Sequence, residues 1–175
     1  MPHLIERAPS GRAKCRGCAQ RIDKDELRVG ERLPNPFAEG EMTLWFHPVC
    51  AAYKRPGPFL EATKTATETL ERQDALVAEA ERGLAHRRLP RIDGGQRAPT
   101  GRARCRCCRE MIAKDSWRIP LVFYEEGRFH ESGFIHAACS REYLGTAEVI
   151  ERIRHFSAEL CDEDLEELRA ELLRS

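Results

Sequence analysis

The chain has 175 residues with 29 basic and 29 acidic side chains, so its formal net charge is zero. That length suits one or two small domains and excludes a large catalytic domain together with any other module. Only 41% of the residues are hydrophobic and 33% are charged, which leaves little apolar material for a large core. We therefore expect a further source of stability, and the eight cysteines are the candidates.

The N-terminal sequence argues against secretion. Residues 1–6 lack the apolar region of a signal peptide, and no segment approaches the roughly 18 apolar residues of a membrane span. We expect a soluble, intracellular protein with no membrane partner. In a reducing compartment, clustered cysteines predict metal ligands rather than disulfides.

A repeat with an offset of 90 residues organises the chain. Ten of the 21 positions in residues 10–30 are identical to their counterparts in residues 100–120. A second match, offset by 89 residues, relates His47–Cys50 to His136–Cys139. Two copies of one structural unit are therefore predicted.

Each copy begins with a short β-rich module. The strand candidates are Glu26–Leu33 and Thr43–Phe46 in the first copy, and Ser116–Tyr124 and Gly133–Ile135 in the second. Turn-forming residues separate the two strands of each copy. Strands this few and short do not bury a core by themselves, so each module needs an additional staple.

Each module is followed by an acidic segment with helical periodicity. Apolar residues recur every three, four or seven positions through residues 60–89, which predicts one helix of about 45 Å. Threonines near its start weaken the first turns. After the second module, Thr146 offers one helix start and Asp162 a second. The Pro- and Gly-containing residues 90–99 are interpreted as a linker.

The predicted class is α+β, with small metal-stabilised domains of short antiparallel strands plus helix. The two modules span residues 1–58 and 100–144. Acidic helical segments follow them at residues 59–89 and 145–175, and the linker spans residues 90–99.

Both modules carry the same set of metal-ligating residues. A Cys-x2-Cys pair is followed by a His-x2-Cys pair, after 28 residues in the first copy and after 27 in the second. Three thiolates and one imidazole form a closed tetrahedral set for Zn²⁺, and a structural zinc supplies on the order of 10 kcal/mol of folding free energy. We predict two Zn²⁺ ions per chain, one held by Cys15, Cys18, His47 and Cys50, the other by Cys105, Cys108, His136 and Cys139.

Two cysteines stand outside these sets. Cys107 offers an alternative pairing with Cys105, but Gly17 occupies the matching position of the first copy, which favours Cys108 as the ligand. Cys161 falls within the C-terminal helical pattern and is predicted to be a core thiol.

The ligand sets argue against a catalytic zinc. Catalytic sites keep one position open for water, whereas four protein ligands are available at each site here. Neither histidine is followed two residues later by the Glu of zinc deaminases, and the His-Glu-x2-His signature of metalloproteases is absent. We predict a non-enzyme, with no catalytic residues and no small-molecule substrate. A redox or catalytic zinc enzyme is the least favoured hypothesis, with Cys107 as the residue that supports a thiol role.

The residues around both sites resemble a known family. Gly-Arg-Ala-x-Cys-x2-Cys, then Ile-x-Lys-Asp-x2-Arg, then Trp-x-His-x2-Cys is similar to the PARP-type zinc finger. This finger is the DNA-break sensor of poly(ADP-ribose) polymerases, and one class of DNA ligases carries it too. The resemblance covers roughly residues 8–56 and 98–144, and neither the helical segments nor a catalytic domain. It implies a stand-alone, bacterial relative with two fingers in tandem.

The resemblance also implies where DNA is contacted. In that family, arginines hold phosphates at a nick or a duplex end, and apolar residues of the loop before the second strand stack on the exposed base pair. Such contacts position a protein without reading sequence. The phosphate contacts implied here are Arg12, Arg28, Arg102 and Arg118, and the stacking residues are Phe37, Met42 and Phe129.

The second finger departs from the family pattern. Phe134 stands where the first finger has Trp45, and both are predicted to be core residues beside the ligand histidine. Glu131 and Ser132 lie about where Met42 lies in the first finger, so the second stacking loop is weaker. We expect the first finger to be the better sensor of DNA ends.

The leading hypothesis is zinc-dependent, sequence-independent DNA binding with recognition of nicks or ends by the two fingers. The alternative is a zinc-stapled module for protein–protein interaction or dimerisation that acts through its acidic helices. The expected partner is nicked or broken duplex DNA, with a second copy of the chain or a repair protein as further candidates. We expect a cytoplasmic protein associated with the nucleoid, or a nuclear one if the source is eukaryotic.

Overall fold

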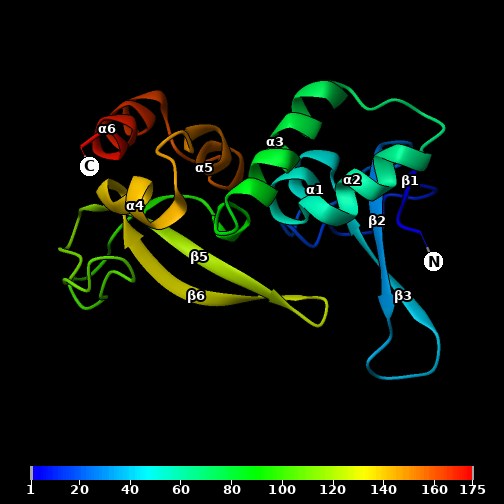
Figure 1. Ribbon diagram of the computed structural model, residues 1–175, viewed down its shortest axis with the longest axis horizontal. Helices are drawn as coiled ribbons and strands as arrows, with labels where there is room; N and C mark the ends of the chain where they lie inside the picture. The colour runs from blue at the N-terminus through cyan, green and yellow to red at the C-terminus, as the bar shows by residue number, and fades with distance from the viewer. Residues whose placement is uncertain (1, 175) are drawn as a thin grey trace. The chain divides into compact units, whose positions relative to one another are not determined.

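The computed structural model describes residues 2–174, and the chain divides into two compact units. Unit 1 comprises Met1–Ala85 and Tyr124–Phe129, and unit 2 comprises His86–Phe123 and His130–Ser175. Each unit has a three-stranded sheet and its own helices (Figure 1). The predicted α+β class is confirmed. Within residues 2–174, no helix combines the length and the apolar content needed to cross a lipid bilayer.

Unit 1 is built on an antiparallel sheet with the strand order β1-β2-β3. Its elements are β1 (Leu4–Arg7), β2 (Leu27–Pro34), β3 (Glu41–Phe46), α1 (Pro48–Lys54), α2 (Pro56–Thr65) and α3 (Gln73–Ala85). Proline opens both α1 and α2, where its missing N–H costs no helical hydrogen bond. Val29 of β2 lies opposite Phe46 of β3, and both are buried together with Phe59 and Ala80 of the helices. The strand β1 has no counterpart among the predicted elements.

The prediction of one helix through residues 60–89 is wrong. Helix α2 ends at Thr65 and α3 begins at Gln73, with Ala66 in an extended conformation after α2. Several threonines in this stretch lose rotamer freedom in a helix. Leu70 is buried, and its backbone N–H donates to the Gln73 side chain over 3.0 Å. The apolar periodicity therefore reflects two helices rather than one long spacer.

The turn between β5 (Trp117–Glu125) and β6 (Arg128–His136) belongs to unit 1. There the Tyr124 hydroxyl donates to the buried carboxylate of Glu31 over 3.2 Å. Glu31 also accepts two hydrogen bonds from Arg55, of 2.9 and 2.5 Å, and the Arg55 guanidinium lies 3.7 Å from the centroid of the Tyr124 ring. Burial, and then the Glu31 carboxylate, raises the pKa of Tyr124. The predicted module of residues 100–144 is therefore not one compact body.

Unit 2 has the strand order β4-β5-β6, with β4 at Gln96–Arg97. Two short turns of 3-10 helix, η1 (Leu89–Arg91) and η2 (Ala137–Cys139), and the helices α4 (Ser140–Leu144), α5 (Ile150–Phe156) and α6 (Asp162–Leu172) complete it. Its largest fully buried apolar side chains come from every part of the unit and include Ile112, Ile119, Ile135, Ile153 and Leu168.

The interpretation of residues 90–99 as a linker is wrong. Gln96–Arg97 form β4, which pairs antiparallel with β5, and Ile92 is buried in the core of unit 2. A Cβ on Gly95 would lie 2.7 Å from Cγ2 of Ile153, so this glycine allows close packing. Residues 90–99 are therefore not a flexible connection. They pack closely in unit 2 and lead into its sheet.

The expectation that Cys161 is a core thiol is also wrong. Cys161 is exposed at the start of α6, where its backbone N–H and its thiol lie 3.2 and 3.3 Å from Oδ2 of Asp164. The helix itself begins at Asp162, as its sequence pattern predicts. Cys161 is thus the exposed N-cap residue of α6 and not a residue of the core.

Candidate metal centres and nucleic-acid face

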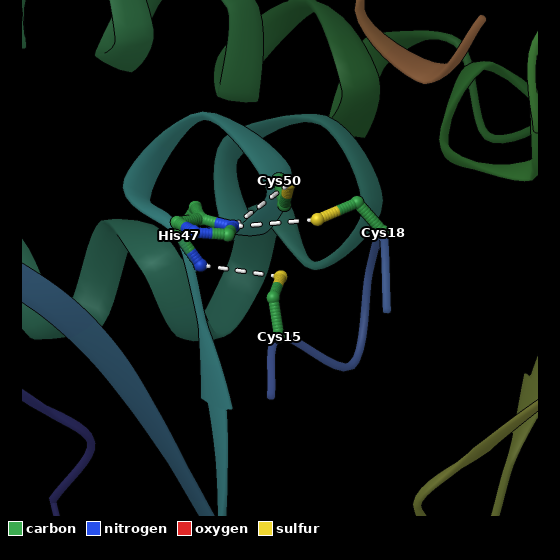
Figure 2. Close-up of side chains that lie close together, drawn as sticks. All are labelled: Cys15, Cys18, His47 and Cys50. Atoms are coloured by element: carbon green, nitrogen blue, oxygen red, sulfur yellow. Dashed lines mark hydrogen bonds between the residues drawn. The ribbon is translucent and has the colours of Figure 1, made fainter. Parts of the chain in front are cut away.

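The first metal centre joins a turn, the end of a strand and a helix. Cys15 and Cys18 lie on the segment between β1 and β2, His47 directly follows β3, and Cys50 lies in α1. The four ligand atoms lie within 4.8 Å of one another, and Figure 2 shows the side chains pointing toward a common centre. Nδ1 of His47 is 3.3 Å from Sγ of Cys18 and 4.0 Å from Sγ of Cys50.

Hydrogen bonds from outside the ligand set hold these side chains in place. Nε2 of His47 lies 3.0 Å from the backbone oxygen of Arg21, which leaves Nδ1 to face the metal position. The backbone N–H groups of Gly17 and His47 each donate to Sγ of Cys15 over 3.3 Å, which stabilises a thiolate. Lys54 of α1 donates to the Gly17 carbonyl over 2.9 Å and so ties the turn to the helix.

The second metal centre has the same geometry. Its ligand atoms also lie within 4.8 Å of one another and belong to Cys105, Cys108, His136 and Cys139. Nδ1 of His136 is 3.4 Å from Sγ of Cys108 and 3.8 Å from Sγ of Cys139, and its Nε2 lies 3.3 Å from the backbone oxygen of Met111. Cys108 is exposed, whereas its counterpart Cys18 is partly buried. The second centre is therefore the more accessible one.

The surroundings of the two centres lower the pKa of some ligand thiols and raise the pKa of others. Hydrogen bonding with the Cys50 side chain, together with His47, lowers the pKa of Cys15 to about 3 despite its burial. The Cys50 side chain likewise lowers the pKa of Cys18 to about 6, and Cys15 raises the pKa of His47 to about 9. Burial raises the pKa of Cys105, but hydrogen bonds from backbone N–H groups outweigh it and bring the pKa to about 7. Hydrogen bonding with Cys15 raises the pKa of Cys50, and burial raises the pKa of Cys139, so one thiol of each set holds its proton until a divalent cation displaces it.

The distances fit tetrahedral Zn²⁺. Zn–S bonds of about 2.3 Å and Zn–N bonds of about 2.0 Å place the ligand atoms roughly 3.5–3.8 Å apart. The S–N separations of 3.3 to 4.0 Å in the two centres lie around that range. Protein atoms supply all four positions, so such an ion ties structural elements together and leaves no open position for chemistry.

The two Cys-x2-Cys turns differ at one position. A Cβ on Gly17 would lie 2.8 Å from Cβ of Cys50, so the first turn packs tightly against α1. Cys107 occupies the matching position of the second turn, where it is partly buried and lies outside the ligand group. The second centre meets the 3-10 turn η2 instead of a regular helix at this point. A side chain is therefore accommodated in one turn and excluded from the other.

The four arginines predicted to hold phosphates fall into two classes. Arg12 and Arg102 are exposed and lie shortly before the two Cys-x2-Cys turns. Arg28 and Arg118 are only 7% and 6% exposed. Each of these buried guanidinium groups lies over the aromatic ring two residues before the ligand histidine, at 3.5 Å in unit 1 and 3.6 Å in unit 2.

The three predicted stacking residues have different surroundings. Phe37 is 79% exposed on the loop between β2 and β3, whereas Met42 is half-buried in β3. Phe129 is half-buried in unit 1, with its ring centroid 6.4 Å from that of Phe46 and 5.1 Å from the Lys54 ammonium. Base stacking by Phe129 stays a prediction, and its packing gives it a structural role in unit 1.

Several supporting residues escaped the sequence analysis. Arg21 and Met111 contribute only backbone carbonyls, which leave no trace in a side-chain pattern. Glu6 and Gln96, which contact the buried arginines, extend the 90-residue repeat upstream of Ser10. Aligning residues 6–9 with residues 96–99 places Glu6 opposite Gln96.

A family model places this geometry among known proteins. Residues 6–85 match the Poly(ADP-ribose) polymerase and DNA-Ligase Zn-finger region. These residues form a PARP-type zinc finger. The match covers the first metal centre and helices α1 to α3, and it describes a zinc-finger region rather than a catalytic one.

Individual relatives carry the PARP-type finger within much longer chains. The chain is 29% identical over 139 residues to Poly [ADP-ribose] polymerase of Drosophila melanogaster, which covers 71% of this chain and 14% of the relative. It is 31% identical over 134 residues to Poly [ADP-ribose] polymerase 1 of Gallus gallus, covering 67% and 13%. The match to Poly [ADP-ribose] polymerase 1 of Caenorhabditis elegans is 42% over 50 residues, 29% of this chain and 5% of the relative. The chain thus spans about one seventh or less of these relatives.

The donor sets and the family together assign two zinc ions to the chain, one to each group of three cysteines and one histidine. The prediction of this cofactor is confirmed. In each centre the ion joins the Cys-x2-Cys turn to the strand end and the element that follows it.

We expect the substitution Gly17→Ala to destabilise the first centre. Its new Cβ meets Cβ of Cys50, and overpacking of this kind costs about 1–3 kcal/mol of unfolding free energy. Denaturant unfolding combined with zinc analysis measures the effect. Cys107→Gly is the matched control and should keep both ions, while a Gly17→Ala chain as stable as the wild type would contradict the tight packing.

We expect a chelator such as EDTA to remove zinc from the second centre before the first. The reason is exposure, because Cys108 and Cys139 are more exposed than their counterparts Cys18 and Cys50. A zinc-sensitive dye should report two phases of release. His47→Ala and His136→Ala chains, each retaining one ion, assign the phases, and faster loss from the first centre would refute the expectation.

Proposed function

We propose that this chain binds duplex DNA without reading its sequence and recognises strand breaks through two zinc-stabilised fingers. PARP-type zinc fingers are known for binding DNA breaks, and the first unit belongs to that type. The fingers act here by binding alone, since each zinc has its four positions filled by protein ligands. The corresponding location is on the DNA of the cell, the nucleoid of a bacterium or the nucleus of a eukaryote.

The observation that carries the proposal is the exposure of Phe37. An aromatic ring that is 79% exposed has no packing function of its own and offers a flat apolar face to a base. The loop that carries it is held in shape, because the Phe37 N–H donates to Oδ1 of Asn35 over 2.9 Å and the Asn35 N–H donates to the Gly40 carbonyl over 3.0 Å. Gly40 has φ +103°, a conformation that glycine adopts without strain.

A base inside an intact duplex is covered on both faces by its neighbours, whereas a nick or an end leaves one face open. A fixed aromatic side chain therefore distinguishes broken from intact DNA through stacking. The Arg128 guanidinium lies 5.8 Å from the centroid of the Phe37 ring, so a positive charge accompanies the stacking face. An aromatic face beside a cation suits a stacked base whose own phosphate lies close by.

The charges around the metal centres supply the affinity. Arg12, Lys14 and Arg16 of the first finger are exposed, and so are Arg102, Arg104 and Arg106 of the second. Guanidinium and ammonium groups bind phosphates of any sequence, and each contact releases counterions from the DNA. This favours binding that is independent of sequence and strongly dependent on salt.

We expect nicked or blunt-ended duplex to compete for the chain at least about tenfold better than a closed circle of the same sequence. The affinity should fall linearly on a double-logarithmic plot against salt concentration. A binding competition among nicked, gapped, blunt-ended and closed DNA, with and without chelator, measures both. Equal binding to closed circular DNA would reject the recognition of breaks, and no binding to any of these DNAs would reject the whole proposal.

We expect Phe37→Ala to remove most of the preference for nicked DNA, with a loss of roughly 1–3 kcal/mol, or about tenfold to hundredfold. Because the side chain is exposed, zinc content and thermal unfolding should not change. Leu84→Ala is the control, since Leu84 is 53% exposed on α3, outside the loop. A Phe37→Ala chain with the wild-type ratio of nicked to closed binding would contradict stacking by this residue.

A further inference from the structure

The same pair of sheet positions faces each buried arginine in the two units. Glu6 of β1 lies opposite Arg28 of β2, and Gln96 of β4 lies opposite Arg118 of β5. Both pairs are related by the 90-residue offset that relates Arg12 to Arg102. The same cross-strand pair therefore occurs in both sheets. The residue opposite the arginine carries a carboxylate in unit 1 and an amide in unit 2.

In unit 1 the arginine charge is neutralised. Nη2 of Arg28 donates to Oε1 of Glu6 over 2.7 Å, and the guanidinium lies 3.5 Å from the centroid of the Trp45 ring. The Arg28 side chain is 8% exposed and that of Glu6 is 43% exposed. The carboxylate is thus more exposed than the cation that it contacts, and the pair carries no net charge.

In unit 2 the arginine charge is not neutralised. Nε and Nη2 of Arg118 donate to Oε1 of Gln96 over 3.0 and 2.6 Å, and the guanidinium lies 3.6 Å from the centroid of the Phe134 ring. Arg118 forms no ion pair with any carboxylate in residues 2–174. Burial lowers the pKa of Arg118, yet an arginine stays protonated at neutral pH. The pair therefore carries one full positive charge.

The residue that follows Glu6 or Gln96 along the strand does not compensate for this difference. Arg7 follows Glu6 and pairs with Glu68, while Arg97 follows Gln96 and pairs with Glu167. Each of these arginines also donates to the backbone carbonyl of an aspartate, Asp25 or Asp115. The charge of the arginine at the next position is thus neutralised in both units. The difference in charge between the two units comes from Glu6 and Gln96.

We propose that the residue opposite the buried arginine sets how strongly each finger attracts a nucleic-acid phosphate, with Glu6 weakening the first finger and Gln96 strengthening the second. This inference rests on the proposed binding of DNA. A charge beneath the surface acts through protein of low polarisability, so it reaches a phosphate at the surface with little screening. The carboxylate of Glu6 cancels that field and repels the phosphate as well.

The amide of Gln96 is not required for the shape of the site. Its Oε1 accepts both hydrogen bonds, and a carboxylate oxygen of the same length accepts them equally well. The exchanges Glu6→Gln and Gln96→Glu therefore change charge with almost no change of volume. They separate the electrostatic effect from the packing of the arginine on its aromatic ring.

The test uses the full zinc-loaded chain and a nicked duplex oligonucleotide, with Kd measured over a series of salt concentrations. Glu6→Gln should tighten binding roughly threefold to tenfold and steepen the salt dependence by about one unit of slope. Gln96→Glu should weaken binding by a similar factor and make the slope shallower by about one unit. The double exchange should return close to the wild-type affinity.

Controls carry the same change of net charge elsewhere. Glu163→Gln and Ala170→Glu lie at exposed positions of α6 and should alter Kd less than about twofold, because exposed charges are screened by salt. A gain of affinity in Glu6→Gln cannot arise from unfolding.

Exchanges that behave like their controls, or that act in the opposite direction, overturn the inference while wild-type binding to nicked DNA stands. A wild-type chain that binds no DNA overturns this inference and the proposed function together, and equal wild-type binding to nicked and closed DNA removes only the recognition of breaks.

Discussion

The interaction on which each unit depends is the bond between one metal ion and four converging side chains. Three thiols and an imidazole lie within 4.8 Å of one another, and thiolates at such distances repel when no cation separates them. In each unit a Cys-x2-Cys turn, the end of a strand and the helix or 3-10 turn that follows it meet at that point. The ion therefore holds these elements together, and its positive charge offsets the repulsion among the thiolates.

The two units use this device in different surroundings. The first packs a glycine against a regular helix and buries two of its thiols, while the second admits a cysteine at the same place and leaves Cys108 open to solvent. The cross-strand partner of the buried arginine changes in the same comparison, from Glu6 to Gln96. The same metal chemistry thus supports one finger with a more buried centre and a neutral pair, and one finger with a more exposed centre and a charged pair.

The sequence predicts the metal ligands, because they are particular side chains at a fixed spacing. It does not predict features that depend on how the backbone packs. The eight metal ligands were found because thiols and imidazoles at a two-residue spacing have few other uses. The sequence does not predict the strand at Gln96–Arg97, since two residues give no period and the neighbouring glycines suggest a flexible linker. The break between α2 and α3 was missed because the apolar period continues through it, although the threonines there disfavour helix. The burial of Arg28 and Arg118 depends on aromatic rings distant in sequence, which no local pattern reveals.

The placement of Tyr124–Phe129 in unit 1 bears on how the chain matures during synthesis. The first 85 residues leave the ribosome well before this turn, which follows after 38 intervening residues. Until then Glu31 and Arg55 have each other but not the Tyr124 hydroxyl, and Phe46 lacks the Phe129 ring. The nascent first finger therefore has all four metal ligands by residue 50, yet it completes its packing only when the hairpin of β5 and β6 has emerged.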